Sequence, residues 1–326
     1  MVAAVEPMLR EQLLDRRQKL QAVATSFYRP AELTHLLEEV DAALRRMDTG
    51  TYGLCEVCHD PVEPERLLAD PLMRVCLGDL TASQQRALED DLELASRIQT
   101  GLLPPRTQNI DGWEISYHYQ PAGTVSGDYC DLIRGDEQTL HFIVGDVSGK
   151  GVAASMLMAH LNAMFRTLVS INLPLENMVE RASRVFCEST LPTQYATLVC
   201  GRANTKGEVE VCNAGHLPPL LVQENGVTAI EATGLPVGVF GTESFAVNRV
   251  QMNKGDTLFL YTDGLSESID GSGNEYGNQR ISSLLRNNCS LAPESMISLC
   301  REELQNFTAG HAPSDDLTLM AIKRTK

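Results

Sequence analysis

The chain has 326 residues, 43% of them hydrophobic and 21% charged, which is the composition of a soluble globular protein and a length that predicts at least two folded units. The formal net charge of −16 disfavours direct binding to nucleic acids or to anionic membranes. No apolar run approaches the roughly 20 residues that span a bilayer, and no basic segment followed by an apolar core marks the N-terminus, so we expect a cytoplasmic protein.

Residues 1–49 are predicted to form a helical hairpin. Apolar residues recur at alternating spacings of four and three from Leu33 to Met47, and a weaker stripe surrounds Leu13. The segment Ser26–Pro30 interrupts the pattern, and its proline suits the first turn of a second helix. Two arms packed against each other explain the stripes more simply than a surface for a partner does.

Residues 50–80 contain a cysteine pattern typical of a structural zinc site. Cys55 and Cys58 form a CxxC pair and Cys76 follows after seventeen intervening residues, but Asp79 stands where a fourth cysteine is expected. A carboxylate oxygen is an accepted zinc ligand, so we expect one Zn²⁺ held by Cys55, Cys58, Cys76 and Asp79. Two alternatives stay open: a three-cysteine site completed by water or His59, and an empty zinc knuckle, meaning that residues 50–80 hold no metal and are held by packing.

Residues 81–105 are predicted to form an amphipathic linker helix. Apolar residues from Leu88 to Leu102 recur on one seam, and Pro104 and Pro105 end the pattern. Such a stripe must be buried against the neighbouring domain or against the same helix of a second chain. We favour the second arrangement, a homodimer through this helix.

Residues 106–326 consist of short β-like runs with helical patterns in two groups. We expect strands at 113–120, 140–147, 195–202, 208–215, 245–252, 256–264 and 316–324, and helices at 152–171, 175–190, 279–288 and 293–307. Many strands with a few grouped helices predict a mixed α/β layered domain rather than strictly alternating βαβ units.

Aspartates lie at the ends of several predicted strands. Asp146 and Asp263 follow buried strands, Asp315 and Asp316 precede another, and Asp128 is expected in a glycine-containing turn. Carboxylate oxygens are the ligands that Mg²⁺ and Mn²⁺ prefer, so their convergence at one sheet edge would form a metal site. Aspartate beside glycine also marks ordinary turns, and the residues alone leave both interpretations open.

Six segments in order resemble the signature of the bacterial SpoIIE/RsbU-type serine phosphatases, a branch of the metal-dependent PPM protein phosphatases. The segments are PAGTVSGDYCD (121–131), GDVSGKGVAA (145–154), NAGHLPP (213–219), GLPVG (234–238), YTDGLSE (261–267) and DDLT (315–318). The resemblance extends from about residue 88 to the C-terminus. It implies a four-layer α/β/β/α sandwich.

The resemblance also implies two Mn²⁺ or Mg²⁺ ions and a metal-activated water that attacks phosphoserine or phosphothreonine in a protein. It assigns Asp146 to both ions and the carbonyl of Val147 to one of them. It assigns the other ion's site to Asp263 and Asp315, and metal-bound water to Asp128. Asp316 could replace Asp315, because sequence cannot separate adjacent aspartates.

Two residues depart from the family pattern. Ser126 stands where a second glycine is common, and Lys150 stands where histidine is common. Both are expected to lie away from the carboxylates, so we expect an active enzyme. His216, in NAGH, could be taken for a catalytic acid, but a structural role within its turn is the expectation.

Residues 1–80 are similar to the DksA/TraR family, in the segment TYGLCEVC, the following ERL-x-A-x-P and the preceding hairpin. Members of that family can insert a hairpin with acidic tip residues into the secondary channel of RNA polymerase. The tip here, SFYRPAEL, has no paired aspartates, and 9 Lys+Arg against 14 Asp+Glu give residues 1–80 a charge of −5. We therefore interpret this unit as a sensory or docking module.

Two hypotheses of different class follow. The first is a phosphatase regulated by its N-terminal module, acting in a sigma-factor partner-switching pathway on a phosphorylated anti-sigma-factor antagonist. The alternative is a non-enzymatic transcription regulator that binds RNA polymerase and uses the phosphatase-like domain as a scaffold.

Overall fold

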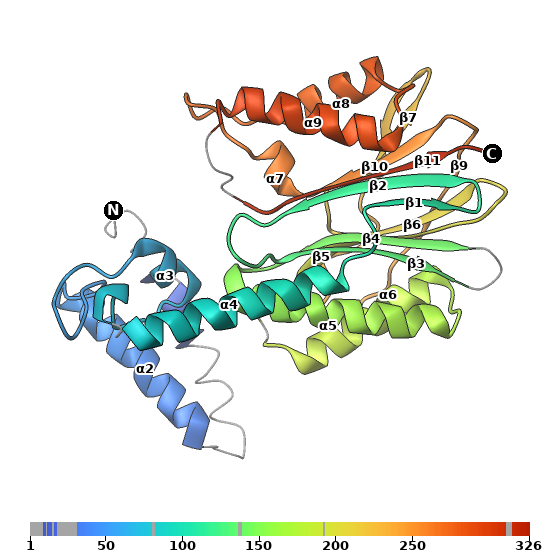
Figure 1. The fold of residues 1–326 in the computed structure, drawn as a ribbon. Coiled ribbons are helices and arrows are strands. Elements are labelled where there is room, and N and C mark those ends of the chain that lie inside the picture. Colours follow the sequence, from blue (N-terminus) through green and yellow to red (C-terminus); the bar gives the residue numbers. More distant parts are fainter. Residues whose placement is uncertain are drawn as a thin grey trace. The chain divides into compact units, whose positions relative to one another are not determined.

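The structure is a computed structural model, and it divides the chain into two compact units, Met1–Asp91 and Leu92–Lys326 (Figure 1). It describes residues 9–10, 12–14, 16–17, 31–79, 82–135, 139–191, 193–310 and 315–326. The boundary between the units falls inside helix α4 (Ala82–Leu102), which corresponds to the predicted linker helix.

The first unit begins with the predicted helical hairpin. Helix α2 (Ala31–Asp48) runs antiparallel to the helical residues around Leu13, because Arg10 pairs with Asp48 at 2.7 Å and Arg17 pairs with Asp41 at 2.8 Å. Leu13 is fully buried against the apolar face of α2. The hairpin is therefore confirmed, while its predicted turn, Ser26–Pro30, lies outside the described residues.

The cysteine segment packs against this hairpin and shares its core. A bridge between Leu54 and Pro61 precedes α3 (Pro64–Ala69), whose first position is a proline as helix starts favour, and the 3-10 helix η1 (Leu77–Asp79) follows. One apolar cluster joins α2 to the cysteine segment through buried residues, namely Tyr52, Cys55, Val62, Leu67 and Cys76. The segment is thus held by packing as well as by any metal.

The second unit contains two antiparallel sheets. The six-stranded sheet has the order β1 (Thr107–Ile110), β2 (Trp113–Gln120), β11 (Leu317–Arg324), β10 (Thr257–Tyr261), β7 (Leu220–Gln223), β8 (Gly226–Ala229). The five-stranded sheet has the order β3 (Asp128–Arg134), β4 (Leu140–Val147), β5 (Ala196–Ala203), β6 (Glu208–Ala214), β9 (Asn248–Gln251).

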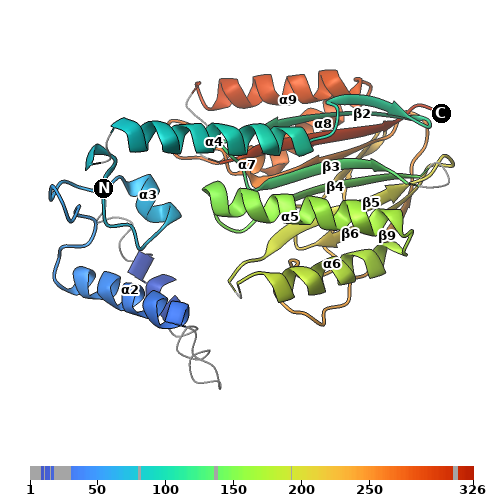
Figure 2. The same cartoon turned by 60° about the horizontal axis from the view of Figure 1, so that its bottom comes forward.

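Helices cover the outer faces of both sheets, which gives the four layers that Figures 1 and 2 show. Helices α5 (Gly151–Ser170) and α6 (Leu175–Ser189) enclose one core with the five-stranded sheet. Helices α8 (Asn278–Asn287) and α9 (Pro293–Phe307) enclose another core with the six-stranded sheet. A third core, which includes Trp113 and Phe142, fills the space between the sheets. The predicted α/β/β/α sandwich is confirmed.

Helix α5 is the one helix among the described residues that is long and apolar enough, by length and composition, to cross a membrane. The sequence alone did not single it out. Its buried residues, including Met158, Leu161 and Phe165, pack against the five-stranded sheet. Its apolar character is therefore explained by its place in a core.

One element of the predicted site differs from expectation. The prediction of a turn at Asp128 is wrong, because Asp128 is the first residue of β3 and the whole stretch to Leu132 is buried. The glycine before it misled the prediction, since glycine beside aspartate usually signals a turn. The strand stays buried because its two aspartates accept hydrogen bonds from other parts of the fold, Asp128 from threonines and Asp131 from Arg166.

Candidate active site and zinc site

Asp128 and Asp146 lie opposite each other on paired strands. They are register partners on β3 and β4, and cross-strand partners place their side chains about 5 Å apart on one face of a sheet. Asp128 is 1% exposed, and its Oδ2 accepts hydrogen bonds from Thr262 Oγ1 at 3.0 Å and Thr318 Oγ1 at 2.5 Å. Thr262 follows β10 and Thr318 lies within β11, both in the other sheet, so this carboxylate joins the two sheets.

Asp263 and Asp315 reach the same region from the six-stranded sheet. Asp263 is the first residue of the short helix α7 (Asp263–Ser266), directly after β10, and Asp315 precedes β11. Strands β10 and β11 are antiparallel, with Tyr261 opposite Leu319, so the end of one lies beside the start of the other. The topology therefore brings both carboxylates to one edge of the sheet.

The electrostatics show that these carboxylates act on one another. Burial, followed by the charges of Asp263, Asp315 and Asp316, raises the pKa of Asp146 to about 7. Burial and the charge of Asp146 raise the pKa of Asp128 well above its ordinary value. Such a cluster is stable in its ionised form only with a counter-cation, and its hard oxygen donors fit Mn²⁺ or Mg²⁺.

In the described part of the chain, the carboxylate oxygens of this cluster do not form a tight cage. Among the described residues, no three carboxylates bring oxygens within 4.8 Å of one another. Gly127 lies directly against the predicted ligand atoms: a Cβ there would be 3.1 Å from the Val147 carbonyl oxygen and 3.3 Å from Asp146 Oδ1. A side chain at this position would crowd both atoms.

Asp315 and Asp316 have different surroundings. The two oxygens of Asp316 accept main-chain hydrogen bonds from Ala122 at 2.7 Å and Gly127 at 2.9 Å. Asp315 Oδ2 instead forms an ion pair with Lys150 Nζ at 2.9 Å, and its side chain is 40% exposed. Asp316 thus holds the loop before β3, whereas Asp315 faces a cation.

The expectation that the two departures from the family pattern lie away from the carboxylates is wrong. Ser126 is fully buried, and its Oγ accepts a hydrogen bond from the main-chain N–H of Asp128 at 3.0 Å. Lys150 pairs with Asp315 and acts electrostatically on Asp146 and Asp263. The Lys150–Asp315 contact joins residues 165 positions apart, whereas Ser126 stands only two residues before Asp128.

His216 has the surroundings of a structural residue. It is 7% exposed, and burial lowers its pKa to about 4. Its Nε2 lies 3.1 Å from the Tyr261 carbonyl oxygen, so this nitrogen must donate, and Nδ1 then accepts from Thr197 Oγ1 at 2.8 Å. With both ring nitrogens engaged, His216 ties β5 to β10 as a neutral imidazole.

A pocket of about 330 Å³ opens beside these residues, lined by Asp146, Asp263, His216, Tyr195 and Glu267, among others. Sequence reasoning missed Glu267 and the two threonines that hold Asp128. Each stands within four residues of a predicted aspartate, in TDGLSE or DDLT, and that proximity was the available signal. A larger hollow at Arg202 and Arg249 contains none of the predicted site residues.

The three cysteines of the first unit come together as predicted. Cys55, Cys58 and Cys76 have sulfur atoms within 4.8 Å of one another, and Cys58 Sγ lies 3.5 Å from Cys76 Sγ. Tetrahedral zinc with bonds of about 2.3 Å separates its sulfur ligands by about 3.8 Å, so the arrangement fits this ion. The main-chain N–H groups of Val57 and Asp60 point at Cys55 Sγ and Cys58 Sγ, both at 3.4 Å, as suits thiolates.

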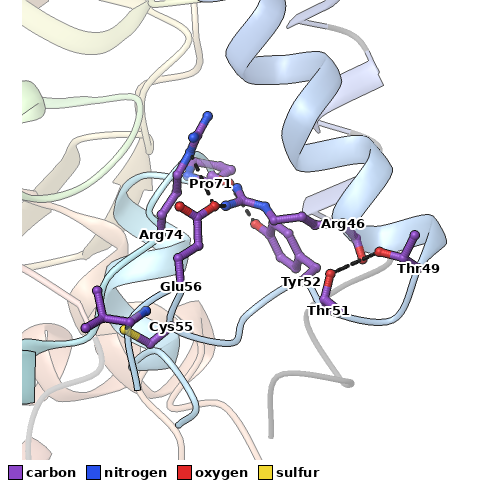
Figure 3. A network of polar contacts seen from close by, with 9 residues as sticks. Arg46, Thr49, Thr51, Tyr52, Cys55, Glu56, Pro71 and Arg74 are labelled. Atoms are coloured by element: carbon purple, nitrogen blue, oxygen red, sulfur yellow. Dashed lines mark hydrogen bonds and ion pairs between the residues drawn. The ribbon is translucent and has the colours of Figure 1, made fainter. Parts of the chain in front are cut away.

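Polar contacts around the cysteines hold the knuckle to the hairpin (Figure 3). Glu56 accepts a hydrogen bond from Arg46 of α2 at 2.7 Å and lies 3.9 Å from Arg74. Tyr52 donates its hydroxyl hydrogen to the Pro71 carbonyl at 2.9 Å. The loop before Cys76 is thereby fixed to the loop that carries Cys55.

The identity of the fourth zinc ligand stays a prediction. The side chain of Asp79 lies outside the described residues. The described His59 is exposed and does not belong to the group of three thiols. None of the nine cysteines, all within the described part of the chain, forms a disulfide.

Family models of known proteins match segments of both units. Residues 136–325, more than half of the chain, match the family model described as Stage II sporulation protein E (SpoIIE). Residues 50–78 match the prokaryotic dksA/traR C4-type zinc finger.

Protein IcfG of Synechocystis sp. is 25% identical over 263 residues, 72% of this chain and 41% of IcfG. Phosphoserine phosphatase RsbU of Bacillus subtilis is 23% identical over 245 residues, 74% of this chain and 72% of RsbU. The solved structure of the RsbU and RsbW domains of Rv1364c from Mycobacterium tuberculosis is 28% identical, with a TM-score of 0.58 over 68% of this chain and 63% of that one. The chain thus spans less than half of IcfG.

Three observations support one conclusion: the family match over most of the layered domain, the shared fold and the clustered aspartates. The chain belongs to the SpoIIE family, whose PPM-type phosphatase domain it carries behind a DksA/TraR-type zinc finger.

Proposed function

We propose that this chain is a cytoplasmic, metal-dependent phosphoserine/phosphothreonine protein phosphatase. The observation that carries the proposal is the clustering of Asp128, Asp146, Asp263 and Asp315, which come from two sheets. Asp146 and Asp263 of this cluster line one pocket. Its similarity to a phosphoserine phosphatase supports the same reaction class. We propose, as the resemblance to the SpoIIE/RsbU-type phosphatases implies, that the substrate is a phosphorylated anti-sigma-factor antagonist in a partner-switching pathway.

Asp146, the Val147 carbonyl, Asp263 and Asp315 would hold two Mn²⁺ or Mg²⁺ ions, and Asp128 would orient a water molecule. When bound, these ions activate water as a nucleophile and neutralise charge on the phosphoryl group. Thr262 and Thr318 fix the rotamer of Asp128 by occupying its Oδ2. Asp316 is assigned to the loop rather than to an ion, because both of its oxygens accept main-chain hydrogen bonds.

The test is an assay of the full chain on a phosphoserine protein with Mn²⁺ and with a chelator. Asp315→Asn is expected to lower the rate at least a hundredfold, whereas Asp316→Asn, which keeps one acceptor oxygen, lowers it less. Glu224→Gln is a matched control, because this exposed residue follows β7 at the end of the sheet remote from Asp263. The absence of Mn²⁺-dependent turnover by the unmodified chain would contradict the proposal.

The first unit is proposed to hold one structural Zn²⁺ through its three cysteines and Asp79 and to regulate the phosphatase domain. Removal of residues 1–80 is expected to change the phosphatase rate or the oligomeric state. If neither changes, the regulatory role is wrong. RNA polymerase binding remains the alternative for this unit, tested by whether the purified polymerase retains the chain.

The linker helix is proposed to mediate a homodimer. Leu102 of the predicted seam packs against the core of its own phosphatase domain, whereas Leu94 and Ile98, one turn apart, are 53% and 58% exposed. Light scattering is expected to show a dimer that Leu94→Lys dissociates. An unmodified chain that is monomeric at all concentrations would refute this arrangement.

A further inference from the structure

Gln99 is a buried polar side chain on helix α4 that neither the sequence patterns nor the family match singled out. It is 5% exposed, and its amide forms a reciprocal pair of hydrogen bonds with the main chain of Ser126. Gln99 Nε2 donates to the Ser126 carbonyl at 2.7 Å, and the Ser126 N–H donates to Gln99 Oε1 at 3.0 Å. A primary amide side chain, with a donor and an acceptor on one carbon, satisfies both main-chain groups at once.

Ser126 connects this pair to the catalytic pocket. Its hydroxyl oxygen accepts the N–H of Asp128, and the next residue, Gly127, donates its N–H to Asp316. Gly127 also accepts a hydrogen bond from Val147 N at 3.3 Å and lies against Asp146 Oδ1. The position of Ser126 therefore determines how closely the chain before β3 approaches the atoms proposed to hold the ions.

The anchoring of α4 does not by itself require this amide. Leu102 and Leu103 at the end of the helix already pack against the core beneath α5 and α6, and Leu103 also packs against the core between the sheets. An apolar side chain at position 99 would add to that packing. Glutamine instead directs two hydrogen bonds at one buried residue of the loop, which specifies the position of the loop rather than only the contact.

We propose that Gln99 is a positioning residue for the phosphatase site, which sets the geometry of Ser126–Asp128 against Asp146 and the Val147 carbonyl. The inference rests on the proposed phosphatase function. Because α4 is one continuous helix from residue 82 to 102, a displacement of its last two turns moves Ser126 through these two hydrogen bonds. Gln99 thus links the position of this helix to the positions of the residues proposed to hold the metal ions.

The experiment compares Gln99→Met, which keeps the length of the side chain without hydrogen bonds, with Gln99→Glu, which keeps only the acceptor for Ser126 N–H. Thr100→Ala, an exposed neighbour on the same helix, is the control. Each full-length variant is measured for Mn²⁺ affinity by calorimetry and for kcat and KM on a phosphoserine protein. Trp113 fluorescence verifies that each variant is folded at the assay temperature.

We expect Gln99→Met to weaken Mn²⁺ binding about fivefold and to lower kcat about tenfold. KM should stay within about twofold, because misplacing the residues around the ions slows the reaction more than it weakens substrate binding. Gln99→Glu is expected to lose less, and Thr100→Ala nothing. If Gln99→Met does not fold, the Glu variant decides the question. A folded Gln99 variant with unchanged Mn²⁺ affinity would overturn the proposal, and an unmodified chain that binds Mn²⁺ without turnover would refute only the phosphatase function.

Discussion

Replacing Asp146 with Asn is expected to stabilise the metal-free phosphatase domain at neutral pH. Burial and the charges of Asp263 and Asp315 raise the pKa of this carboxyl from 3.8 to about 7 in the folded protein. The folded state then holds the proton more tightly than the unfolded chain. The contribution of the group to stability is therefore most favourable below pH 4 and is lost as the pH rises towards 7.

The magnitude follows from the shift. At 1.36 kcal/mol per pH unit, ionisation of Asp146 costs the metal-free fold at most about 4 kcal/mol above pH 7. Because Asp146 is only partly enclosed, water at the pocket mouth reduces the cost, and we expect Asp146→Asn to gain about 2 kcal/mol. Mn²⁺ at a hundred times its dissociation constant would stabilise the unmodified protein by about 2.7 kcal/mol, but not the variant.

Urea unfolding measures both effects. Trp113 is the single tryptophan, is 2% exposed in the core between the sheets, and so reports on the phosphatase domain alone. The variant should be the more stable protein at pH 8 with a chelator, and the difference should shrink towards pH 5. A variant that is less stable at pH 8, or that gains as much stability from Mn²⁺ as the unmodified chain, would show that the Asp146 carboxylate does not destabilise the metal-free fold.

Three further changes test other parts of the structure. Cys58→Ser and Cys76→Ser are each expected to abolish zinc binding measured by mass spectrometry, while Cys187→Ser, outside the cluster, retains it; zinc retained in all three would contradict the site. Arg166→Met should lower the free energy of unfolding by about 3 kcal/mol, because it leaves the fully buried Asp131 carboxylate without its cation, and adding Asp131→Asn should restore part of the loss. Gly264→Ala should lower the free energy of unfolding by about 1–3 kcal/mol, because the added methyl group would collide with the Asp316 carbonyl oxygen. Gly271→Ala, which places its methyl group in open space, should change this free energy little. Equal effects of the two substitutions would exclude the collision.

The sequence predicted the layered fold well because its strands and helices carry strong local patterns. Helix α9 begins at Pro293 and ends at Phe307, as its periodicity indicates, and β4 coincides with the apolar run that ends in GDV. Short elements with weak patterns escaped prediction. Strands β7 and β8 form a hairpin of four residues on each side, too short for alternation to be recognised.

The site was predictable only as a set of candidate residues. Motif order identified Asp128, Asp146, Asp263 and Asp315, but local sequence could not show that Thr262 and Thr318 would share one oxygen of Asp128. It could not separate Asp315 from Asp316 either, because that difference depends on main-chain groups almost two hundred residues away in the sequence. Gln99 escaped for the same reason: its partner lies on a loop beyond the next two strands.

The most direct test of the proposed phosphatase function is the Mn²⁺-dependent release of phosphate from a phosphoserine protein, measured for the full chain beside Asp146→Asn and Glu224→Gln. A metal-dependent phosphatase site at Asp146 predicts turnover by the unmodified chain and by Glu224→Gln, and a loss of at least a hundredfold in Asp146→Asn. Turnover that is unchanged in Asp146→Asn, or absent from all three proteins, would contradict it.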